Sequence, residues 1–327
     1  MKKRLSIVLM ALLTMSLFFT GCGSKAAQTN SEASRAAAQT EAAREMTVKM
    51  LNVGQGDAIL IETPEQTVLI DTSDLDEQEK LRTELKKAGI KRIDKLILTH
   101  PHADHIGGVE GVVLKDYEVG EVYDNGMPSK SKIYTRYMKL LKQKNIKRHG
   151  LTAGDELDFG GGVKFKVFAP EKTVVEKGSK TTEGHDPNNE SVVGQLIFGD
   201  FTMMFTGDAE KAEEEPMVHA YGNNLKSKIL KAGHHGSKTS SSAAFLKAVS
   251  PEAVLISCGA GNDYGHPHAQ TMKRYQMMKL KIFETDKNGT ITVKTDGKAY
   301  SIVPETGDAQ SFLHILTATK ASWQYSC

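Results

Sequence analysis

The segment 99–108, with the sequence THPHADHIGG, places four potential metal ligands within six positions. It continues directly from the apolar run 95–99, which predicts a short buried strand. Imidazoles beside a carboxylate suit a borderline divalent cation such as Zn²⁺, and Mn²⁺ also accepts this mixture of ligands. The segment therefore predicts a metal site at the end of a strand, to which distant parts of the chain must bring further ligands. The four side chains are His100, His102, Asp104 and His105.

Strand-like and helix-like segments alternate from residue 46 to residue 304. Apolar runs between turn residues predict strands, whereas apolar residues spaced three and four apart predict helices. Both halves of this region open with strands and then interpose helices, which predicts an α/β fold of two packed sheets with helices outside. Predicted strands cover 47–53, 58–63, 67–70, 95–99, 121–123, 163–168, 191–198, 201–205, 228–231, 253–257, 281–284, 290–294 and 299–303, with a hairpin turn at 198–201. Predicted helices cover about 76–88, 131–143, 209–221, 242–249 and 269–277, and one more begins near Gly107.

The first 45 residues predict a targeting signal followed by a flexible tether. Basic residues at 2–4 precede the apolar run 5–19, which is shorter than the roughly 20 residues that a spanning helix needs. The sequence FTGC at 19–22 resembles a bacterial lipobox, in which cleavage precedes a cysteine that receives the lipid. We therefore expect a signal peptide at 1–21, lipidation at Cys22, and a flexible tether at 22–45 that lacks the large apolar residues needed to fold. An ordinary signal peptide with an incidental cysteine is the alternative.

The remaining boundaries and the location follow from these assignments. The folded domain is predicted to span 46–304, outside the cytoplasm of a bacterium, with the lipid anchor as its only membrane contact. The tail 305–327 is unassigned, and its Leu313 and Trp323 could dock as a terminal helix or stay frayed. The 42 Lys and Arg residues against 40 Asp and Glu leave a net charge of +2, which requires no broad basic face for nucleic acid. Three cysteines exclude a disulfide scaffold.

The pattern His100-x-His102-x-Asp104-His105 resembles the signature of the metallo-β-lactamase superfamily, αββα sandwiches that are mostly metal-dependent hydrolases. More narrowly, the chain resembles the soluble hydrolase-like domain at the carboxyl end of the ComEC/Rec2 competence proteins, over about residues 46–303. No part of it resembles the polytopic channel of those proteins. The further matching segments are 52–57 (NVGQGD), 69–72 (LIDT), 188–191 (NNES), 205–208 (FTGD), 230–237 (LKAGHHGS) and 264–267 (YGHP).

The resemblance assigns roles to two aspartates that follow predicted strands. It implies that Asp208 bridges two metal ions, although Asp208 could also cap the helix that follows it. It implies that Asp71 orients the site from behind the ligands. A carboxylate after a Val/Leu/Ile strand is costly to bury unless it is hydrogen-bonded or close to cations, and a turn-capping aspartate is the alternative. Asp104 and Asp208 would position and deprotonate the reacting water.

Two histidine-containing segments supply the remaining candidates. His100 and His102 can face one ion while Asp104 and His105 face another. His234 is the expected further ligand of the ion at Asp104 and His105, because neighbouring side chains of an extended backbone point to opposite faces and His235 would then face away. His235 or His266 would protonate the leaving group, and His266 is alternatively a ligand. The expected metal ligands are thus His100, His102, Asp104, His105, Asp208 and His234. The expected substrate-binding residues are Lys231, Ser237, Lys238 and Asn189.

One departure from the superfamily pattern bears on the metal. Many members carry another ligand histidine just before the strand that starts here near Ser191, but this chain has Asn188 and Asn189, and His185 is a weak substitute. Because asparagine is a weak neutral ligand, we expect one or two divalent cations, Zn²⁺ or Mn²⁺, rather than a firmly held zinc pair.

These expectations predict a metal-dependent hydrolase that uses metal-activated water on a phosphodiester. An extracellular nuclease or phosphodiesterase acting on single-stranded DNA, in competence-related processing, fits the resemblance. A non-catalytic surface lipoprotein that binds nucleic acid or a cell-wall phosphate is the alternative from another class. Hydrolysis of a lactam, lactone or thioester is disfavoured by the missing histidine. No protein partner is predicted.

Overall fold

The computed structural model describes residues 45–178, 180, 183–307 and 313–315. The predicted signal peptide, Cys22 and nearly all of the predicted tether lie outside these residues, as does Trp323. Within them, no helix has the length and apolar character needed to cross a membrane. The described residues form one compact unit, and its architecture is what positions the candidate site.

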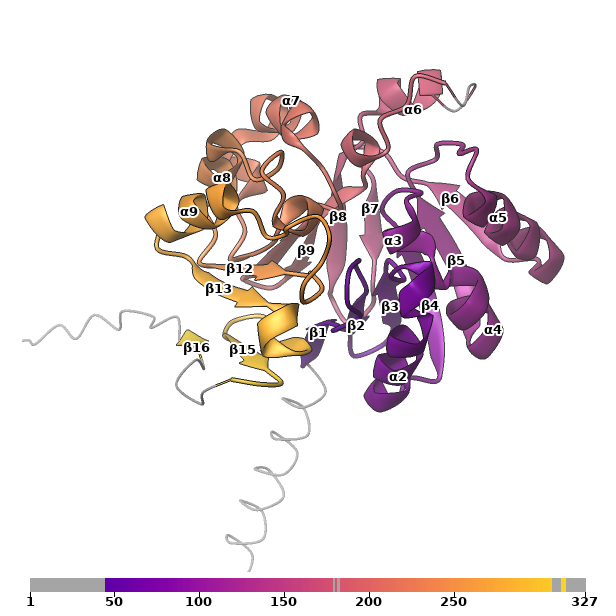
Figure 1. Ribbon diagram of the computed structural model, residues 1–327, viewed down its shortest axis with the longest axis horizontal. Helices are drawn as coiled ribbons and strands as arrows, with labels where there is room; N and C mark the ends of the chain where they lie inside the picture. The colour runs from indigo at the N-terminus through magenta and orange to yellow at the C-terminus, as the bar shows by residue number, and fades with distance from the viewer. Residues whose placement is uncertain (1–44, 179, 181–182, 308–312, 316–327) are drawn as a thin grey trace, which may run out of the picture. The chain divides into compact units, whose positions relative to one another are not determined.

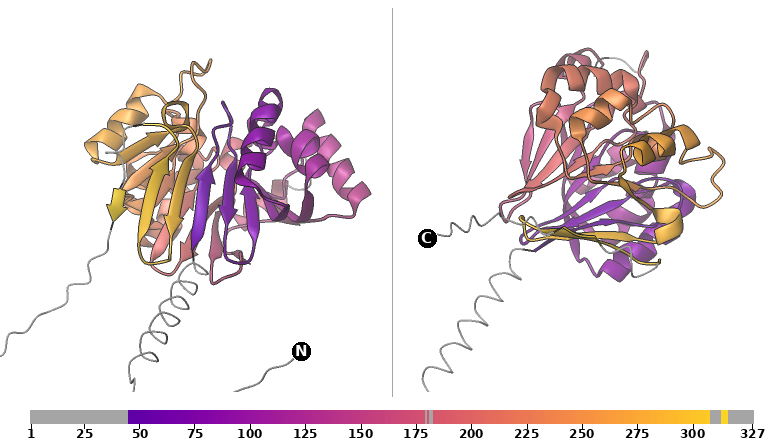
Figure 2. Two further views of the ribbon diagram at one scale, coloured as in Figure 1. Left: turned by 90° about the horizontal axis from the view of Figure 1, so that it is seen from below. Right: turned by 90° about the vertical axis from the view of Figure 1, so that its left-hand side faces the viewer.

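Two mixed sheets form the centre of the domain (Figures 1 and 2). The first sheet has the strand order β16-β15-β14-β1-β2-β3-β4-β5-β6 and the second has the order β13-β12-β11-β10-β9-β8-β7. The first sheet consists of β1 (Met46–Met50), β2 (Ile59–Glu62), β3 (Thr67–Ile70), β4 (Arg92–Leu98), β5 (Glu118–Asp124), β6 (Lys147–Gly150), β14 (Ile291–Thr295), β15 (Tyr300–Pro304) and β16 (Leu313–Ile315). The second consists of β7 (Glu156–Asp158), β8 (Lys164–Ala169), β9 (Val193–Phe198), β10 (Phe201–Phe205), β11 (Ile229–Lys231), β12 (Ala253–Ile256) and β13 (Lys281–Glu284).

Helices cover the outer face of each sheet (Figure 2). On the first sheet lie α2 (Gln78–Ala88), α3 (Ala103–Ile106), α4 (Leu114–Asp116) and α5 (Lys132–Lys144). On the second lie α7 (Lys211–Tyr221), α8 (Ala243–Val249) and α9 (Ala269–Met277). Two further short helices are α6 (Lys172–Gly178) and α10 (Thr285–Asn288).

Three apolar clusters hold these layers together. The first lies between the sheets and joins Ile61 of β2 to Met203 of β10. The other two lie between a sheet and its helices, and Leu60 of β2 packs with the helical residue Leu85 in one of them. Ile61 and Leu60 enter different clusters because successive side chains of a strand point to opposite faces. Strands covered on both faces are apolar throughout, and the predicted αββα sandwich is confirmed.

Most element bounds agree with the sequence-based expectation. β3, β10, β13 and α9 have the predicted bounds, and the antiparallel pairing of Phe198 with Phe201 confirms the hairpin. The patterns missed β6, β7, α6 and α10, which are short. Leu313 lies in β16, which pairs with β15, so the alternative of a terminal helix at this residue is wrong.

The helix predicted to begin near Gly107 begins instead at Ala103 and continues into a π-helical turn, η2 (Val109–Val113). Gly107 has an ordinary right-handed helical backbone, with φ −61°. A Cβ on Gly107 would overlap the backbone nitrogen of Leu75, and a Cβ on Gly108 would overlap the carbonyl oxygen of Thr72. The two glycines are therefore required by close packing against the segment after β3, not by a helix start.

The carboxyl ends of parallel strands meet at one edge of each sheet. In the first sheet β3 and β4 are parallel, and Asp71 and the histidine-rich segment follow them. In the second sheet β10, β11 and β12 are parallel, and Asp208 follows β10. Ligands from both sheets are thereby brought to the same end of the sandwich.

Candidate metal centre

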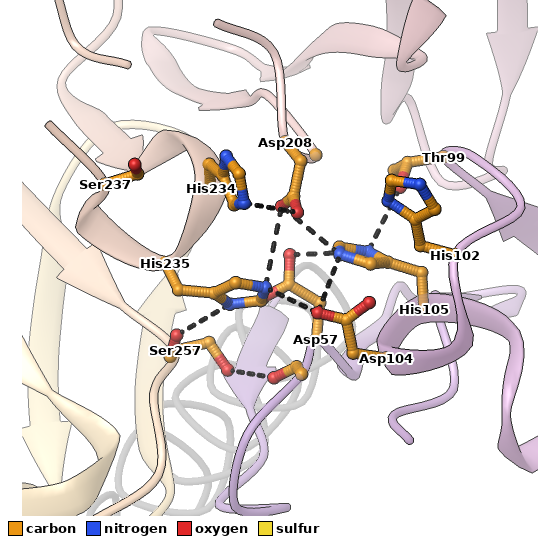
Figure 3. A network of polar contacts seen from close by, with 12 residues as sticks. Asp57, Thr99, His102, Asp104, His105, Asp208, His234, His235, Ser237 and Ser257 are labelled. Atoms are coloured by element: carbon orange, nitrogen blue, oxygen red, sulfur yellow. Dashed lines mark hydrogen bonds and ion pairs between the residues drawn. The ribbon is translucent and has the colours of Figure 1, made fainter. Parts of the chain in front are cut away.

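Four potential ligands from distant segments gather at this edge (Figure 3). Asp104, His105, Asp208 and His235 each offer a ligand atom, and these atoms all lie within 4.8 Å of one another. His105 Nε2 is 3.2 Å from Asp208 Oδ1, and His235 Nε2 is 3.3 Å from Asp104 Oδ2. We call these four residues the ligand group.

Three of the facing atoms of the ligand group lie close to one another but make no hydrogen bond within the described part of the chain. His105 Nε2, His235 Nε2 and Asp208 Oδ1 are buried and make no hydrogen bond with any residue that the structure describes. Unpartnered buried polar atoms are costly, and here three of them converge. Two imidazoles and two carboxylates with this separation fit a divalent cation.

Neighbouring groups fix the orientation of both imidazoles. Asp71 Oδ2 accepts a hydrogen bond from His105 Nδ1 at 2.8 Å, and the carbonyl oxygen of Ser257 accepts one from His235 Nδ1 at 2.9 Å. Each ring therefore turns its Nε2 toward the ligand group. Asp71 is itself held by the backbone N–H and the hydroxyl of Thr99, at 2.8 and 2.7 Å.

The charges of the ligand group support one another. Burial opposes ionisation, but His105 and His235 hold the pKa of Asp104 and Asp208 well below the usual range of a carboxyl. Burial alone would lower the pKa of His105 and His235. The nearby carboxylates, of which Asp208 has the largest effect, outweigh burial, so both pKa values are raised. A divalent cation would take the place of the imidazole protons in this balance.

His100 and His102 lie on the other side of Asp208. Their rings contact each other, with His100 Nε2 at 3.0 Å from His102 Nδ1, and His100 Nε2 is 3.9 Å from Asp208 Oδ2. Asn188 borders the same cavity, and its Oδ1 is buried without a hydrogen-bond partner among the described residues. This side therefore offers two imidazoles, a shared carboxylate and a weak amide ligand.

The turn at η5 (Gly233–Gly236) overturns the preference for His234 over His235. Both residues have a left-handed backbone, with φ 48° and 52°, so the alternation of an extended chain does not apply. His235 completes the ligand group. His234 lies at its edge, with Nε2 at 3.7 Å from Asp208 Oδ2 and Nδ1 at 3.0 Å from Glu210 Oε1.

Lys231 is not at the mouth of the site, which corrects its assignment as a substrate-binding residue. Its side chain is fully buried, forms an ion pair with Asp57, and donates a hydrogen bond to the carbonyl oxygen of Gly207 at 2.8 Å. Burial lowers its pKa, but the carboxylates of Asp57 and Asp208 outweigh burial and raise it. Lys231 therefore remains charged inside the protein and cannot reach a substrate.

Two other predicted substrate-binding residues also lie away from the cavity. Asn189 Oδ1 accepts hydrogen bonds from the backbone N–H groups of Glu210 and Glu213 at 3.2 Å, and these bonds tie the turn η3 (Asn188–Glu190) to the start of α7. Ser237 is buried, and its hydroxyl contacts that of Thr239 at 2.8 Å (Figure 3 shows it outside the ligand network). Asn189 and Ser237 therefore serve local structure.

Lys238 and His185 complete the list of sequence candidates. Lys238 is exposed, and its backbone N–H donates to His268 Nδ1 at 3.1 Å. Lys238 does not line the cavity beside the ligand group, and its role in binding a substrate stays a prediction. His185 Nδ1 lies 2.8 Å from Glu190 Oε1, which accounts for this ring without a metal.

A cavity of about 330 Å³ borders the ligand group. His266 lies on its wall, its Nδ1 is buried and unpartnered among the described residues, and burial and the neighbouring histidines lower its pKa to about 4. Sequence reasoning missed Asp57, although the matched segment 52–57 ends in it, because its partner Lys231 is remote in the chain. It also assigned no role to three residues of the cavity wall whose side chains carry polar atoms: Gln55, Asp74 and Tyr264.

Comparison with known proteins agrees with this geometry. The chain is 32% identical over 278 residues to ComE operon protein 3 of Bacillus subtilis, covering 79% of this chain and 34% of that protein. It is 32% identical over 248 residues to competence protein ComA of Neisseria gonorrhoeae, covering 76% and 32%. The chain thus spans about a third of the length of these relatives, and its resemblance to competence proteins is confirmed.

Solved structures and a family profile complete the comparison. A diphosphatase of the PhnP family superposes with a TM-score of 0.46 at 16% identity, covering 77% of this chain and 97% of the other. The profile of the metallo-β-lactamase superfamily matches residues 51–260, which include the complete ligand group. The chain therefore belongs to the metallo-β-lactamase superfamily.

Proposed function

We propose that this protein hydrolyses phosphodiesters with a divalent cation, Zn²⁺ or Mn²⁺, held by Asp104, His105, Asp208 and His235. The observation that carries the proposal is the convergence in this group of three buried ligand atoms that make no hydrogen bond with a described residue. A second, weaker ion would use His100, His102 and Asp208. Asp71 supports the first ion by fixing the ring of His105.

A bound divalent cation supplies a water of lowered pKa and a positive charge for the phosphoryl oxygens. Around it, Asp104 and Asp208 position the water through their carboxylates. His234 borders the cavity, and the contact of its Nδ1 with Glu210 Oε1 at 3.0 Å leaves its Nε2 on the side of Asp208. His234 is therefore placed to give a proton from Nε2 to the leaving oxygen. His266, with its lowered pKa, is neutral near pH 7 and suits hydrogen bonding to the substrate.

The names of the relatives support nucleic acid as the substrate. One is named a competence protein and another, from Haemophilus influenzae, is named recombination protein 2, so we propose single-stranded DNA outside the cytoplasm as the phosphodiester. The sequence around Cys22 supports a lipid anchor that holds the domain at the outer face of the cell membrane.

The test uses the full-length chain purified in detergent. We expect elemental analysis to find Zn²⁺ or Mn²⁺. The protein should cleave a fluorescent single-stranded oligonucleotide, and a chelator should stop this cleavage. His105→Ala and Asp208→Ala should lose cleavage, because each removes a ligand of the proposed ion. His219→Ala, an exposed histidine of α7 outside the cavity, is the matched control and should retain it. Oligonucleotide binding that persists in both site variants, without turnover under Zn²⁺, Mn²⁺ or Mg²⁺ in the wild type, would establish a binding lipoprotein instead.

A further inference from the structure

Tyr264 stands out at the rim of the metal cavity. It borders the cavity, yet 64% of its surface is exposed. Five large hydrophobic side chains are exposed in the described part of the chain, and Tyr264 is the only aromatic one. Burial in the core therefore does not explain an aromatic residue at this position.

Local contacts order the loop that carries Tyr264 and place one face of its ring against His266. Asn262 closes the loop on both sides of it, because its Nδ2 donates to the carbonyl oxygen of Gly259 at 2.9 Å and its Oδ1 accepts from the backbone N–H of His266 at 3.0 Å. One face of the Tyr264 ring stacks on His266, with centroids 5.6 Å apart and planes 18° from parallel. A ring placed in this way loses little conformational entropy when another ring binds to it.

The stack continues inward to the ligand group. His266 lies nearly parallel to His235, with centroids 6.0 Å apart and an interplanar angle of 29°. A row of rings therefore leads from the surface, through Tyr264 and His266, to a ligand of the cation. A strand with one phosphate at the ligand group would pass along this row, and its next bases would come to the exposed ring.

We propose that Tyr264 forms a nucleobase subsite, on which a base flanking the scissile phosphate stacks. The subsite rests on the proposed function and narrows its substrate class to nucleic acid rather than to phosphodiesters in general. Every base has a flat face, so stacking on a tyrosine tolerates any sequence. A lone aromatic ring beside a polar cavity is too small a surface for a protein partner.

The experiment compares two single-stranded oligonucleotides of the same length, one complete and one whose central nucleotides are abasic, with an intact phosphodiester backbone. The full-length protein is tested as wild type and as Tyr264→Ala and Tyr264→Phe. Met277→Ala removes another exposed apolar side chain, outside the cavity wall, and is the matched control. We expect Tyr264→Ala to raise KM for the complete strand roughly 5- to 150-fold, the usual value of one base–aromatic stack. KM for the abasic strand should stay unchanged, and Tyr264→Phe should behave as the wild type.

Equal losses on the two strands in Tyr264→Ala would overturn the subsite, because Tyr264 would then act only through the placement of His266. Binding of both strands to the Asp208→Ala variant separates this proposal from the proposed function. If the wild type cleaves neither strand, hydrolysis fails as the function, but preferential binding of the complete strand that disappears with Tyr264→Ala still supports the subsite. If no variant distinguishes the strands in binding, the subsite is wrong whatever the activity.

Discussion

The potential metal ligands on the two sides of Asp208 differ in how firmly the surrounding residues hold them. On the side of the ligand group, the rings of His105 and His235 are each fixed by an acceptor at Nδ1, and their Nε2 atoms are free for a cation. On the other side, His100 and His102 contact each other, and Asn188, a weak amide ligand, lines the same cavity. The comparison indicates that affinity depends on preorganised ligands as well as on their number.

The largest effect expected on the side of the ligand group is on stability. Lys231→Met removes the buried partner of Asp57 and leaves a buried carboxylate without its cation. Such a loss lowers the free energy of unfolding by about 3–5 kcal/mol. Urea denaturation measures it, with exposed Lys238→Met as the control. The double variant Lys231→Met with Asp57→Asn should recover part of the loss, and unchanged stability of the single variant would show that the pair does not support this side.

The next effect separates the two sides directly. Replacing a group that only orients a ligand costs about 10–100-fold in metal affinity, so losing the ligand itself should cost more. We expect His235→Ala to weaken binding of the first ion by more than about 100-fold, and His102→Ala to leave that affinity within about 10-fold. Competition with a chromophoric chelator measures both. Equal losses would erase the distinction between the sides.

Orientation alone should have an intermediate effect. Asp71→Asn keeps the shape of the side chain but removes the carboxylate that accepts the His105 Nδ1 proton. Affinity for the first ion should fall about 10–100-fold. The same titration measures it, and folding is checked by circular dichroism. A folded variant with wild-type affinity would show that ring orientation is not limiting.

The smallest effect is a gain on the other side. Asn188→His adds an imidazole to the cavity beside His100 and His102. We expect elemental analysis at equal free metal to show the second ion rising toward one per chain, with the affinity for the first ion within about 10-fold of the wild type. Asn189→His is the control, since Asn189 is turned toward α7. A stoichiometry that does not change would mean that this side is limited by something other than the missing ligand.

The sequence predicted those parts of the molecule that depend on local pattern. Alternating apolar runs identified the strands that are covered on both faces, because burial on two sides makes them apolar throughout. It missed β6 and β7, whose residues are largely polar and exposed, because they lie at the ends of the sheets, where such residues carry no strand pattern.

The candidate site divides in the same way. Asp104 and His105 could be found because they lie close together in the chain, and Asp208 because it directly follows an apolar strand. The error on Lys231 arose because its burial depends on Asp57, which lies in the other half of the sequence. The preference for His234 failed because the chain turns through a left-handed conformation there, and two neighbouring histidines give no local sign of it.

The hydrogen bond between Ser257 and Gly56 has a consequence for the order in which the site forms. The hydroxyl of Ser257 donates to the carbonyl oxygen of Gly56 across 201 positions of sequence, next to the pairing of Asp57 with Lys231. Contacts of such long range form late, because the intervening chain must be ordered first. The candidate metal site can therefore be completed only after the segment around Ser257 has been synthesised, because Asp208, His235 and the Ser257 carbonyl that orients His235 all come late in the chain.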